Sequence, residues 1–186
     1  GPVTQRRITA TIFDHNLTFT TAGGVFSGSR LDPGTAVLLR TFEPPQSGHL
    51  LDLGCGFGPI AVALAVAGPA VTVDAVDVNA LAVELTRVNA AEAGVADRVR
   101  ATAPDDVPPD ATYSQIWSNP PIRVGKEALH ALLLTWLPRL TPDGVARLVV
   151  SKNLGGDSLQ RWLIDQGYPT ERVASTKGFL TQLVAC

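Results

Sequence analysis

Three glycines in five positions, Gly54, Gly56 and Gly58, constrain this chain more than any other feature of its sequence. A short apolar run at residues 50–53 precedes them, and a second apolar run at residues 60–67 follows. This order predicts a strand, a tight turn and the start of a helix. Because glycine lacks a Cβ and adopts positive φ readily, a ligand can lie against such a turn and meet unpaired N–H groups of the first helical turn. We therefore predict a loop that binds a nucleotide or nucleoside cofactor.

The spacing of the glycines and the charge beside them favour one class of cofactor. A dinucleotide-binding loop has the pattern G-x-G-x-x-G, whereas this chain has G-x-G-x-G, with Pro59 in place of the third glycine. Asp52, just before the loop, puts a carboxylate where a pyrophosphate would be repelled and a cationic amino group attracted. S-adenosylmethionine carries such an amino group and no phosphate. An ordinary glycine-rich turn without a ligand is the alternative.

The composition indicates one globular domain. The 186 residues are 45% hydrophobic, which suits a single core. No uncharged apolar segment is long enough for a membrane span, and no apolar signal-peptide region begins the sequence, so we expect a cytoplasmic protein that contacts no membrane. The formal net charge of −2 differs from the basic balance of a strong nucleic-acid binder. An RNA substrate would therefore need a local basic patch.

The cysteine and histidine spacing predicts neither a metal site nor a disulfide framework. Cys55 lies in the glycine loop and Cys186 ends the sequence, without a C-x-x-C motif. His15, His49 and His130 have no metal-ligand spacing among them. We therefore expect no bound metal.

Strand-like and helix-like segments alternate along most of the chain, which predicts an α/β fold with a doubly wound, mostly parallel sheet. The predicted strands are residues 50–53, 71–76, 99–102, 113–117 and 146–151, and the predicted helices are residues 60–67, 80–93, 126–137 and 159–165. Residues 173–175 and 179–184 predict a final strand pair, which would form an antiparallel edge of the sheet.

The N-terminal part is predicted to add a β-hairpin to this sheet. Residues 7–20 alternate apolar and polar side chains on either side of Asp14, His15 and Asn16, where we expect the turn. A glycine-rich loop at residues 21–28 follows, and then a helix from residue 31 to about residue 42.

The second predicted strand ends at Asp77, which follows the glycines by about 20 residues. An acidic side chain there can accept hydrogen bonds from both hydroxyl groups of a ribose. NAD and S-adenosylmethionine both contain a ribose, so Asp77, with Val78 beside it, indicates a nucleoside without choosing between them. The alternative is a helix N-cap, which Asp77 or Asn79 could form without a ligand.

The fourth predicted strand runs into the sequence Asn119-Pro120-Pro121-Ile122. Two consecutive prolines fix an extended backbone and restrict the residue before them. The amide carbonyl of Asn119 and the backbone carbonyl of Pro120 would then be rigid acceptors for the two N–H groups of a planar amine. They would direct the nitrogen of that amine toward a methyl donor. The alternative is a proline-rich turn in which Asn merely favours the turn geometry.

Taken together, the glycine loop, Asp77 and residues 119–122 resemble the class I S-adenosylmethionine-dependent methyltransferases that carry the N-P-P-[IFY] signature of amino-group methylation. Within that class the chain resembles the small-domain family, which is related to bacterial 16S and 23S ribosomal RNA guanine-N2 enzymes. Residues 24–27 (G-V-F-S) and 32–35 (D-P-G-T) look like the family's segment ahead of the glycine loop. Residues 119–126 look like its single-domain bacterial branch.

This resemblance implies a Rossmann-like fold, S-adenosyl-L-methionine as the cofactor and methylation of an exocyclic amino group, with guanine N2 of ribosomal RNA as the leading target. The catalytic residues it implies are Asn119, Pro120, Pro121 and Ile122. The cofactor-binding residues it implies are Asp52, Gly54, Cys55, Gly56, Gly58, Asp77, Val78 and Asn119. We expect residues 1–45 to form the hairpin and a segment that covers the site, and residues 46–186 to form the methyltransferase domain, in one compact unit.

The same resemblance implies contacts with RNA. Ile122 stands where adenine and glutamine methylators carry an aromatic residue, so we expect Phe26 to stack on a flipped base. Arg123 and Lys126 follow the motif and are expected to contact phosphate, with a solvated helix start as the alternative. Members of this family often carry an acidic pair after the third strand that holds the adenine amino group. Residues 103–106 (A-P-D-D) are short and have no clear register with that pair, so no adenine contact is assigned.

Three functions remain open from the sequence. The leading one is methylation of guanine N2 in RNA, with ribosomal RNA or a ribosomal subunit as the partner and a monomer or weak homo-oligomer as the active form. The second is methylation of a protein glutamine amide or another nucleobase amine. The third is a module that binds S-adenosylmethionine or a nucleotide without catalysis.

Overall fold

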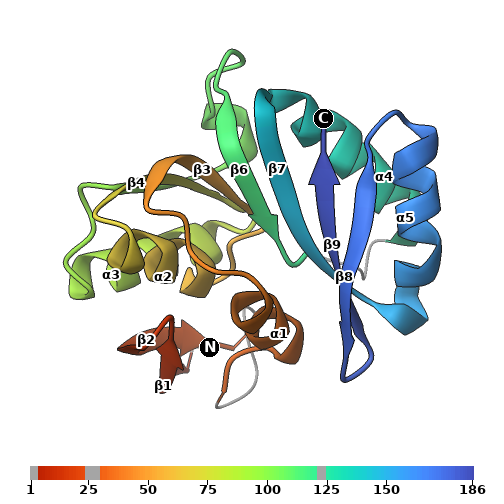
Figure 1. Cartoon of the computed structure of the whole chain (residues 1–186). Helices are drawn as coiled ribbons and strands as arrows, with labels where there is room; N and C mark the ends of the chain where they lie inside the picture. The colour runs from red at the N-terminus through yellow and green to blue at the C-terminus, as the bar shows by residue number, and fades with distance from the viewer. Residues whose placement is uncertain (1–3, 24–29, 121–124) are drawn as a thin grey trace.

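The chain forms an α/β fold, which we describe from a computed structural model of residues 4–23, 30–120 and 125–186 (Figure 1). Its strands are β1 (Gln5–Ile12), β2 (His15–Ala22), β3 (Ser47–Leu53), β4 (Ala70–Val76), β5 (Val99–Thr102), β6 (Tyr113–Ser118), β7 (Leu140–Ser151), β8 (Thr170–Thr176) and β9 (Phe179–Ala185). Its α-helices are α1 (Pro33–Thr41), α2 (Pro59–Ala67), α3 (Ala80–Glu92), α4 (Gly125–Trp136) and α5 (Gly156–Asp165). Short 3-10 helices are η1 (Pro104–Asp106), η3 (Leu137–Arg139) and η4 (Lys152–Leu154).

Seven strands form one sheet in the order β5, β4, β3, β6, β7, β9, β8 (Figure 1). The first five of these run parallel, and β9 is antiparallel to both of its neighbours. The predicted doubly wound sheet with an antiparallel C-terminal edge is therefore confirmed. The order of the last two strands was not predicted, because β9 lies between β7 and β8 although it follows β8 in the chain.

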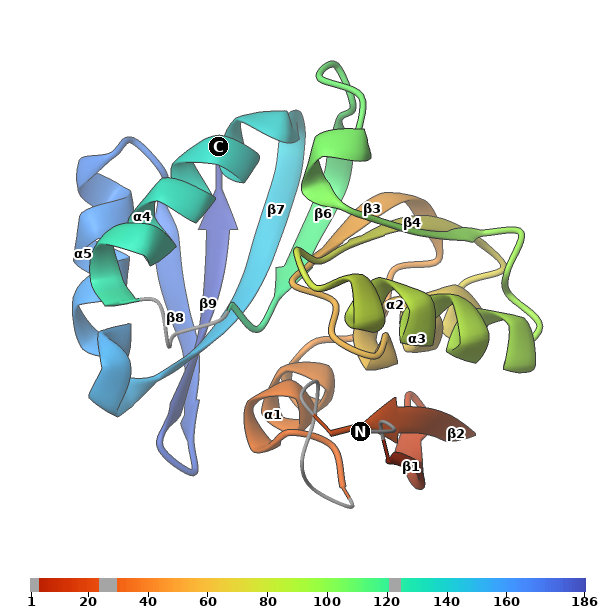
Figure 2. The same cartoon turned by 180° about the vertical axis from the view of Figure 1, so that it is seen from behind.

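Each face of the sheet has its own hydrophobic core. Helices α1, α2 and α3 and the N-terminal hairpin pack on one face, around side chains such as Leu50, Val73 and Trp117. Helices α4 and α5 pack on the other face, around Leu51 and Ile116 (Figure 2). Period-2 alternation along the buried strands sends successive apolar residues to opposite cores. Within the described residues, no helix is long and apolar enough to cross a membrane.

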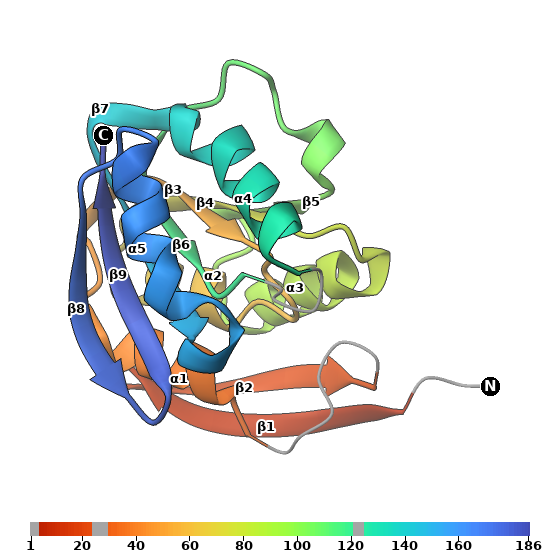
Figure 3. The same cartoon turned by 90° about the vertical axis from the view of Figure 1, so that its right-hand side faces the viewer.

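The hairpin β1–β2 lies against the outer side of α2 and α3 (Figure 3). Asn89 of α3 fixes it, since its buried amide accepts from the N–H of Thr20 at 2.8 Å and donates to the carbonyl oxygen of Thr20 at 2.9 Å. The expected turn at residues 14–16 is wrong by one position. Phe13 and Asp14 make the turn at φ values of 51° and 64°, and His15 already pairs with Ile12.

The register of the parallel strands determines which residues meet at their carboxyl ends. Leu53 of β3 is paired with Val76 of β4 and with Ser118 of β6. The residues that follow these partners, Gly54, Asp77 and Asn119, therefore emerge side by side at one edge of the sheet. Ligands of open α/β sheets bind beyond this edge.

Candidate functional site

The glycine loop follows β3 directly, and its three glycines have φ values of 76° at Gly54, 57° at Gly56 and 98° at Gly58. These left-handed conformations favour glycine at all three positions. A Cβ on Gly56 would meet no described atom within 4 Å, so the loop is open there. A Cβ on Gly58 would lie 2.9 Å from Cγ2 of Thr86. Gly58 is therefore needed for the packing of α2 against α3.

Two adjoining cavities lie along this loop and share Gly54, Gly56 and Asn119 in their walls. The first has a volume of about 290 Å³ and extends over the ends of β3 and β4 toward α4. The second has a volume of about 170 Å³ and extends toward the starts of α1 and α2. Asn119 stands where the two meet. A ligand with a nucleoside part and an amino-acid part would fit this division.

Asp77 holds the glycine loop in position. Its Oδ2 accepts from the N–H of Gly56 at 2.9 Å, and its Oδ1 accepts from the N–H of Asn79 at 2.9 Å. The N-cap of α3 is Asn79, whose Oδ1 accepts from the N–H of Leu81 at 2.9 Å, so Asp77 is not the cap residue. The carboxylate of Asp77 lines the larger cavity, where its remaining lone pairs can accept from a ligand.

The far end of the larger cavity is apolar. Val78 is 89% exposed at its rim, the largest exposure of any bulky apolar side chain in the described part of the chain. Pro104 of η1 and Leu132 and Trp136 of α4 complete this end. Sequence reasoning missed all three. Apolar walls around a few placed polar groups are typical of small-molecule sites.

The amide of Asn119 has a fixed orientation. Its Nδ2 donates to Oδ2 of Asp32 at 2.8 Å and to Oγ1 of Thr35 at 3.0 Å. Asp32 is also the N-cap of α1, because it accepts from the N–H of Thr35 at 3.1 Å. Both amide hydrogens of Asn119 are thus used, and its Oδ1 bonds to no described residue. Asn119 therefore presents Oδ1 as an acceptor of fixed orientation.

Asp52 does not line either cavity. It is 0% exposed, and its Oδ2 accepts from the N–H of Ala61 in the first turn of α2 at 3.0 Å. Its Oδ1 is buried without a partner among the described residues. Burial raises the pKa of this carboxyl to about 7, opposed by the Ala61 hydrogen bond and reinforced by the nearby charge of Asp77. Asp52, predicted from the sequence to bind the cofactor, thus lies behind the loop and out of both cavities.

The start of α2 offers fewer free N–H groups than the sequence suggested, because Pro59 has none and Ala61 donates to Asp52. Cys55 is buried, with its sulfur 3.4 Å from Oγ1 of Thr86. Burial and the neighbouring Asp52 carboxylate raise the pKa of the Cys55 thiol. This cysteine lines the smaller cavity as an uncharged group.

The remaining predicted residues divide into two groups. Pro120 is buried at the end of β6, and Lys126 is exposed in the first turn of α4. Phe26, Pro121, Ile122 and Arg123 lie outside the described residues. In the described ranges, no three histidine, cysteine or acidic side chains are placed to hold a metal ion.

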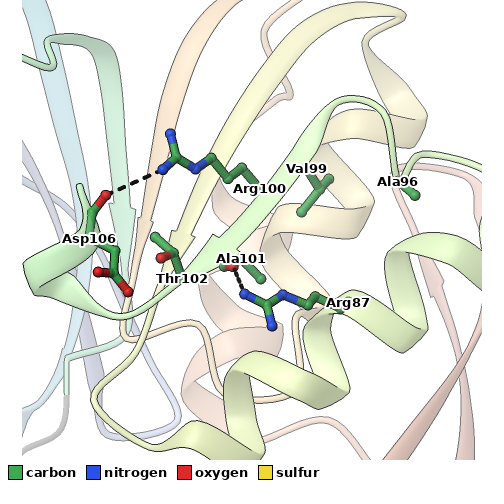
Figure 4. Close-up of a pocket in the computed structure, with 7 residues that line it drawn as sticks. All are labelled: Arg87, Ala96, Val99, Arg100, Ala101, Thr102 and Asp106. Atoms are coloured by element: carbon green, nitrogen blue, oxygen red, sulfur yellow. Dashed lines mark hydrogen bonds between the residues drawn. The ribbon is translucent and has the colours of Figure 1, made fainter. Parts of the chain in front are cut away.

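A third cavity, with a volume of about 680 Å³, lies away from the glycine loop, over β5 and α3 (Figure 4). Two arginines line it, but each already donates to the backbone. Arg87 donates to the carbonyl oxygen of Ala101 at 2.9 Å, and Arg100 donates to that of Asp106 at 3.3 Å. No glycine loop or positioned acceptor opens into it, so size alone does not make it the functional site.

Comparison with known proteins gives a family match over most of the chain. The family model described as "Methyltransferase small domain" matches residues 16–181. YbxB of Bacillus subtilis, described as uncharacterized, is 37% identical over 147 residues, which cover 77% of this chain and 73% of that protein. The ribosomal RNA small subunit methyltransferase C of Klebsiella pneumoniae is 40% identical over 141 residues, which cover 73% of this chain and 41% of that protein.

Solved structures share the same fold. The 16S rRNA N2 G1207 methyltransferase of T. thermophilus, in complex with AdoMet and guanosine, matches with a TM-score of 0.84 at 23% identity, over 99% of this chain and 51% of that one. A ribosomal protein L11 methylase from Lactobacillus delbrueckii matches with a TM-score of 0.66 at 22% identity, over 84% of this chain and 83% of that one. The chain thus spans about half the length or less of the matched ribosomal RNA methyltransferases.

Proposed function

This chain belongs to the methyltransferase small-domain family, and from that premise we propose that it transfers a methyl group from S-adenosyl-L-methionine to guanine N2 in ribosomal RNA. The observation that carries the proposal is the fixed amide of Asn119. Asn119 lines both cavities, and the hydrogen bonds of its Nδ2 to Asp32 and Thr35 fix the plane of the amide. Such an acceptor suits an amino group that must present its lone pair in one direction.

The residues around the cavities fit the cofactor. Gly56 leaves open the space that a Cβ would fill, and Asp77 offers a carboxylate to ribose hydroxyls beside it. Val78 and Pro104 give an apolar surface for a flat base. The carboxyl of Asp52 lies behind the loop, and its ionised form, present above its pKa of about 7, would favour a cation. When bound, S-adenosylmethionine supplies a methyl group on a positively charged sulfur.

Asn119 and Pro120 would position the target. The Oδ1 of Asn119 and the backbone carbonyl of Pro120 accept the two N–H groups of the target amine and direct its nitrogen at the methyl carbon. The nitrogen lone pair would take the methyl group from the bound cofactor, which leaves as S-adenosylhomocysteine, and the amine would then lose a proton. Guanine N2 is a weak nucleophile, so alignment is the main contribution, and alignment can supply up to about 7 to 11 kcal/mol.

The segment ahead of the sheet domain takes part in this arrangement. Asp32 and Thr35 belong to residues 1–45 but contact Asn119 directly. This supports our assignment of residues 1–45 as the part that completes the site and of residues 46–186 as the methyltransferase domain. We place Lys126 on the RNA side, at the exposed start of α4.

Ribosomal RNA is proposed as the substrate because of the relatives' stated activities. The protein of Klebsiella pneumoniae is a ribosomal RNA methyltransferase, and the T. thermophilus enzyme methylates N2 of a guanine in 16S rRNA. An amino group in a duplex is out of reach, so the target guanine must be unpaired or flipped out. A ribosomal substrate also implies a cytoplasmic location.

The test is a methyl-transfer assay with labelled S-adenosylmethionine. The chain is incubated separately with 16S rRNA, 23S rRNA, each ribosomal subunit and total protein, and the labelled product is digested and identified. We expect N2-methylguanosine from at least one RNA sample. Label in glutamine only, or no label despite measured cofactor binding, would overturn the proposal.

A further inference from the structure

We infer that the RNA lies across the β6–β7–β9 side of the site, with the target base against Phe179 and its flanking phosphates on Lys126, Lys152 and Lys177. This inference rests on the proposed function and adds the surface along which the RNA substrate binds. It follows from three observations: the position of the Phe179 ring, the distribution of the three lysines and the hydrogen bonds of the arginines.

Phe179 lies next to the positioned amide. It begins β9 and is paired with Ser151 at the end of β7, so it extends beyond Asn119 along the sheet. A Cβ placed on Gly34 of α1 would lie 3.0 Å from Cε1 of Phe179 and 3.2 Å from Nδ2 of Asn119. The aromatic ring and the amide therefore meet around the same glycine. The ring is only partly buried, which leaves it a surface to offer a base.

An aromatic ring at this place has a chemical use. The residue after the two prolines is Ile122, which cannot stack on a base as an aromatic side chain does. Stacking of a base on an aromatic side chain tolerates any base and holds it in a plane. Phe179 would supply that surface from a strand far from the motif in sequence.

All three lysines of the chain lie at the carboxyl edge of the sheet. Lys126 is in the first turn of α4, Lys152 directly follows β7, and Lys177 is in the turn between β8 and β9. Lys152 and Lys177 are close in space, because the N–H of Lys152 donates to the carbonyl oxygen of Gly178, the residue after Lys177, at 2.8 Å. All three side chains are exposed, and none bonds to or forms an ion pair with a described residue.

The arginines of the opposite side contrast with these lysines. Arg87 and Arg100, which line the 680 Å³ cavity, donate to backbone carbonyl oxygens (Figure 4). Arg98 donates to three more carbonyl oxygens, at 2.8 to 3.0 Å. Near the lysines, the carboxylate of Asp157 is 3.5 Å from Arg172 and is thereby partly neutralised. In a chain with a formal charge of −2, the three exposed lysines thus lie at the same edge of the sheet as Asn119. A polyanion would be attracted to that side.

The test measures RNA affinity directly and needs no methyl transfer. The probe is a short fluorescent hairpin RNA with one unpaired guanine in its loop, titrated by anisotropy at several salt concentrations. Each lysine that contacts phosphate contributes about 0.7 to the slope of log affinity against log salt for a single strand. We expect Lys152→Gln with Lys177→Gln to reduce that slope by about 1.4. Arg100→Gln, the matched control at the other surface, should leave it unchanged.

Phe179 has its own pair of variants. Phe179→Leu keeps an apolar side chain against α1 but removes the aromatic ring, and we expect it to weaken RNA binding by about 5- to 150-fold. Phe179→Tyr should bind as the unmodified chain does. Thermal unfolding and cofactor affinity should be retained in both. If Phe179→Leu fails to fold, the salt slope of the lysine variant decides the inference.

The outcomes separate the inference from the proposed function. An unchanged salt slope in the lysine variant, or a slope reduced by Arg100→Gln instead, would overturn the RNA path while leaving methyl transfer intact. Full RNA affinity in a folded Phe179→Leu would overturn the assignment of the base contact. Reduced slope and affinity in a chain that methylates no RNA would support the path and reject the proposed reaction.

Discussion

Asp52 and Asp74 are buried carboxylates on neighbouring strands, but they lie on opposite faces of the sheet and are treated differently. Asp74 of β4 is 5% exposed and accepts from the hydroxyl of Tyr113 at 2.7 Å and from Nε2 of His49 at 3.3 Å. Asp52 of β3 is 0% exposed and accepts only from Ala61 among the described residues, with one oxygen unpaired. The carboxylate of Asp74 is therefore hydrogen-bonded to two side chains within the fold, whereas that of Asp52 keeps one oxygen without a hydrogen bond.

The same contrast separates other polar groups of the two regions. Around Asp74, the ring of His49 stacks on Tyr113 at 5.1 Å, and its Nδ1 lies 2.7 Å from Oγ1 of Thr72. At the carboxyl edge, Asn119 has one end fixed by Asp32 and the other end available. Buried polar groups normally find partners, so a group left without one is a candidate for binding a ligand. We therefore expect the fully hydrogen-bonded network around Asp74 to contribute mainly to stability. Polar groups with an open acceptor, such as Asn119, should contribute mainly to activity.

The largest expected effect is on Asn119. Asn119→Ala should lower kcat for methyl transfer by about 100- to 1,000-fold, the scale for removing one preorganised hydrogen-bonding group. The affinity for S-adenosylmethionine, measured by calorimetry, should change little, because the Ala side chain leaves the glycine loop and Asp77 in place. An unchanged kcat in the variant would show that Asn119 has a structural role, as the residues around Asp74 do, and no role in methyl transfer.

The next effect concerns stability and pH at Asp52. Its folded pKa of about 7 lies above the usual value, so the folded state binds the proton more tightly than the unfolded state. The contribution of this group is therefore complete at low pH and is lost as pH rises through 7. Asp52→Asn should remove that dependence. Relative to the variant, the free energy of unfolding of the unmodified chain should fall by about 2 to 4 kcal/mol between pH 4 and 8.

Urea unfolding at several pH values checks this prediction. Asp74→Asn is not a suitable control because it breaks a network, so the unmodified chain and Asp52→Asn are compared at each pH. Parallel pH profiles for the two would show that the Asp52 carboxyl is not held neutral by burial.

A smaller effect is expected for the cofactor side. Asp77→Asn should weaken binding of S-adenosylmethionine by about 10- to 100-fold, because charge-assisted hydrogen bonds contribute about 1.5 to 3 kcal/mol. Part of that loss would come from the glycine loop, since Asp77 also accepts from the N–H of Gly56. Calorimetric titration measures the affinity. Equal affinity in the variant would remove Asp77 from the cofactor site.

The smallest effect is expected in the hydrogen-bonded network around Asp74. Tyr113→Phe removes the hydroxyl that donates to Asp74 and should lower the free energy of unfolding by about 1.5 kcal/mol. The kcat and the cofactor affinity should not change, because Tyr113 lies on the α4 and α5 face and lines neither cavity of the site. Lost activity in a folded variant would show that the two regions are coupled.

Much of this site could be predicted because its residues follow strand ends directly. Gly54, Asp77 and Asn119 each come after a predicted strand, and the parallel register then aligns them. Gly58 was assigned to the cofactor, but its role in packing against Thr86 depends on a helix contact that spacing does not encode.

The partners of Asn119 could not be predicted. Asp32 and Thr35 are 87 and 84 residues away from it in the chain, and their local pattern indicates only a helix cap. Leu132 and Trp136 likewise look like ordinary core positions of an amphipathic helix. Contacts between distant segments depend on how helices pack on the sheet, which a single sequence does not contain.

The insertion of β9 between β7 and β8 has a consequence for the order of folding. A chain folded only as far as β8 would leave β7 with an open edge, because β8 pairs only with its own successor. Such an edge invites pairing with other chains. The strand that closes the edge is also the one that begins with Phe179. The ring beside Asn119 therefore arrives with the step that completes the sheet, and a partly folded chain would lack the surface that we propose for the target base.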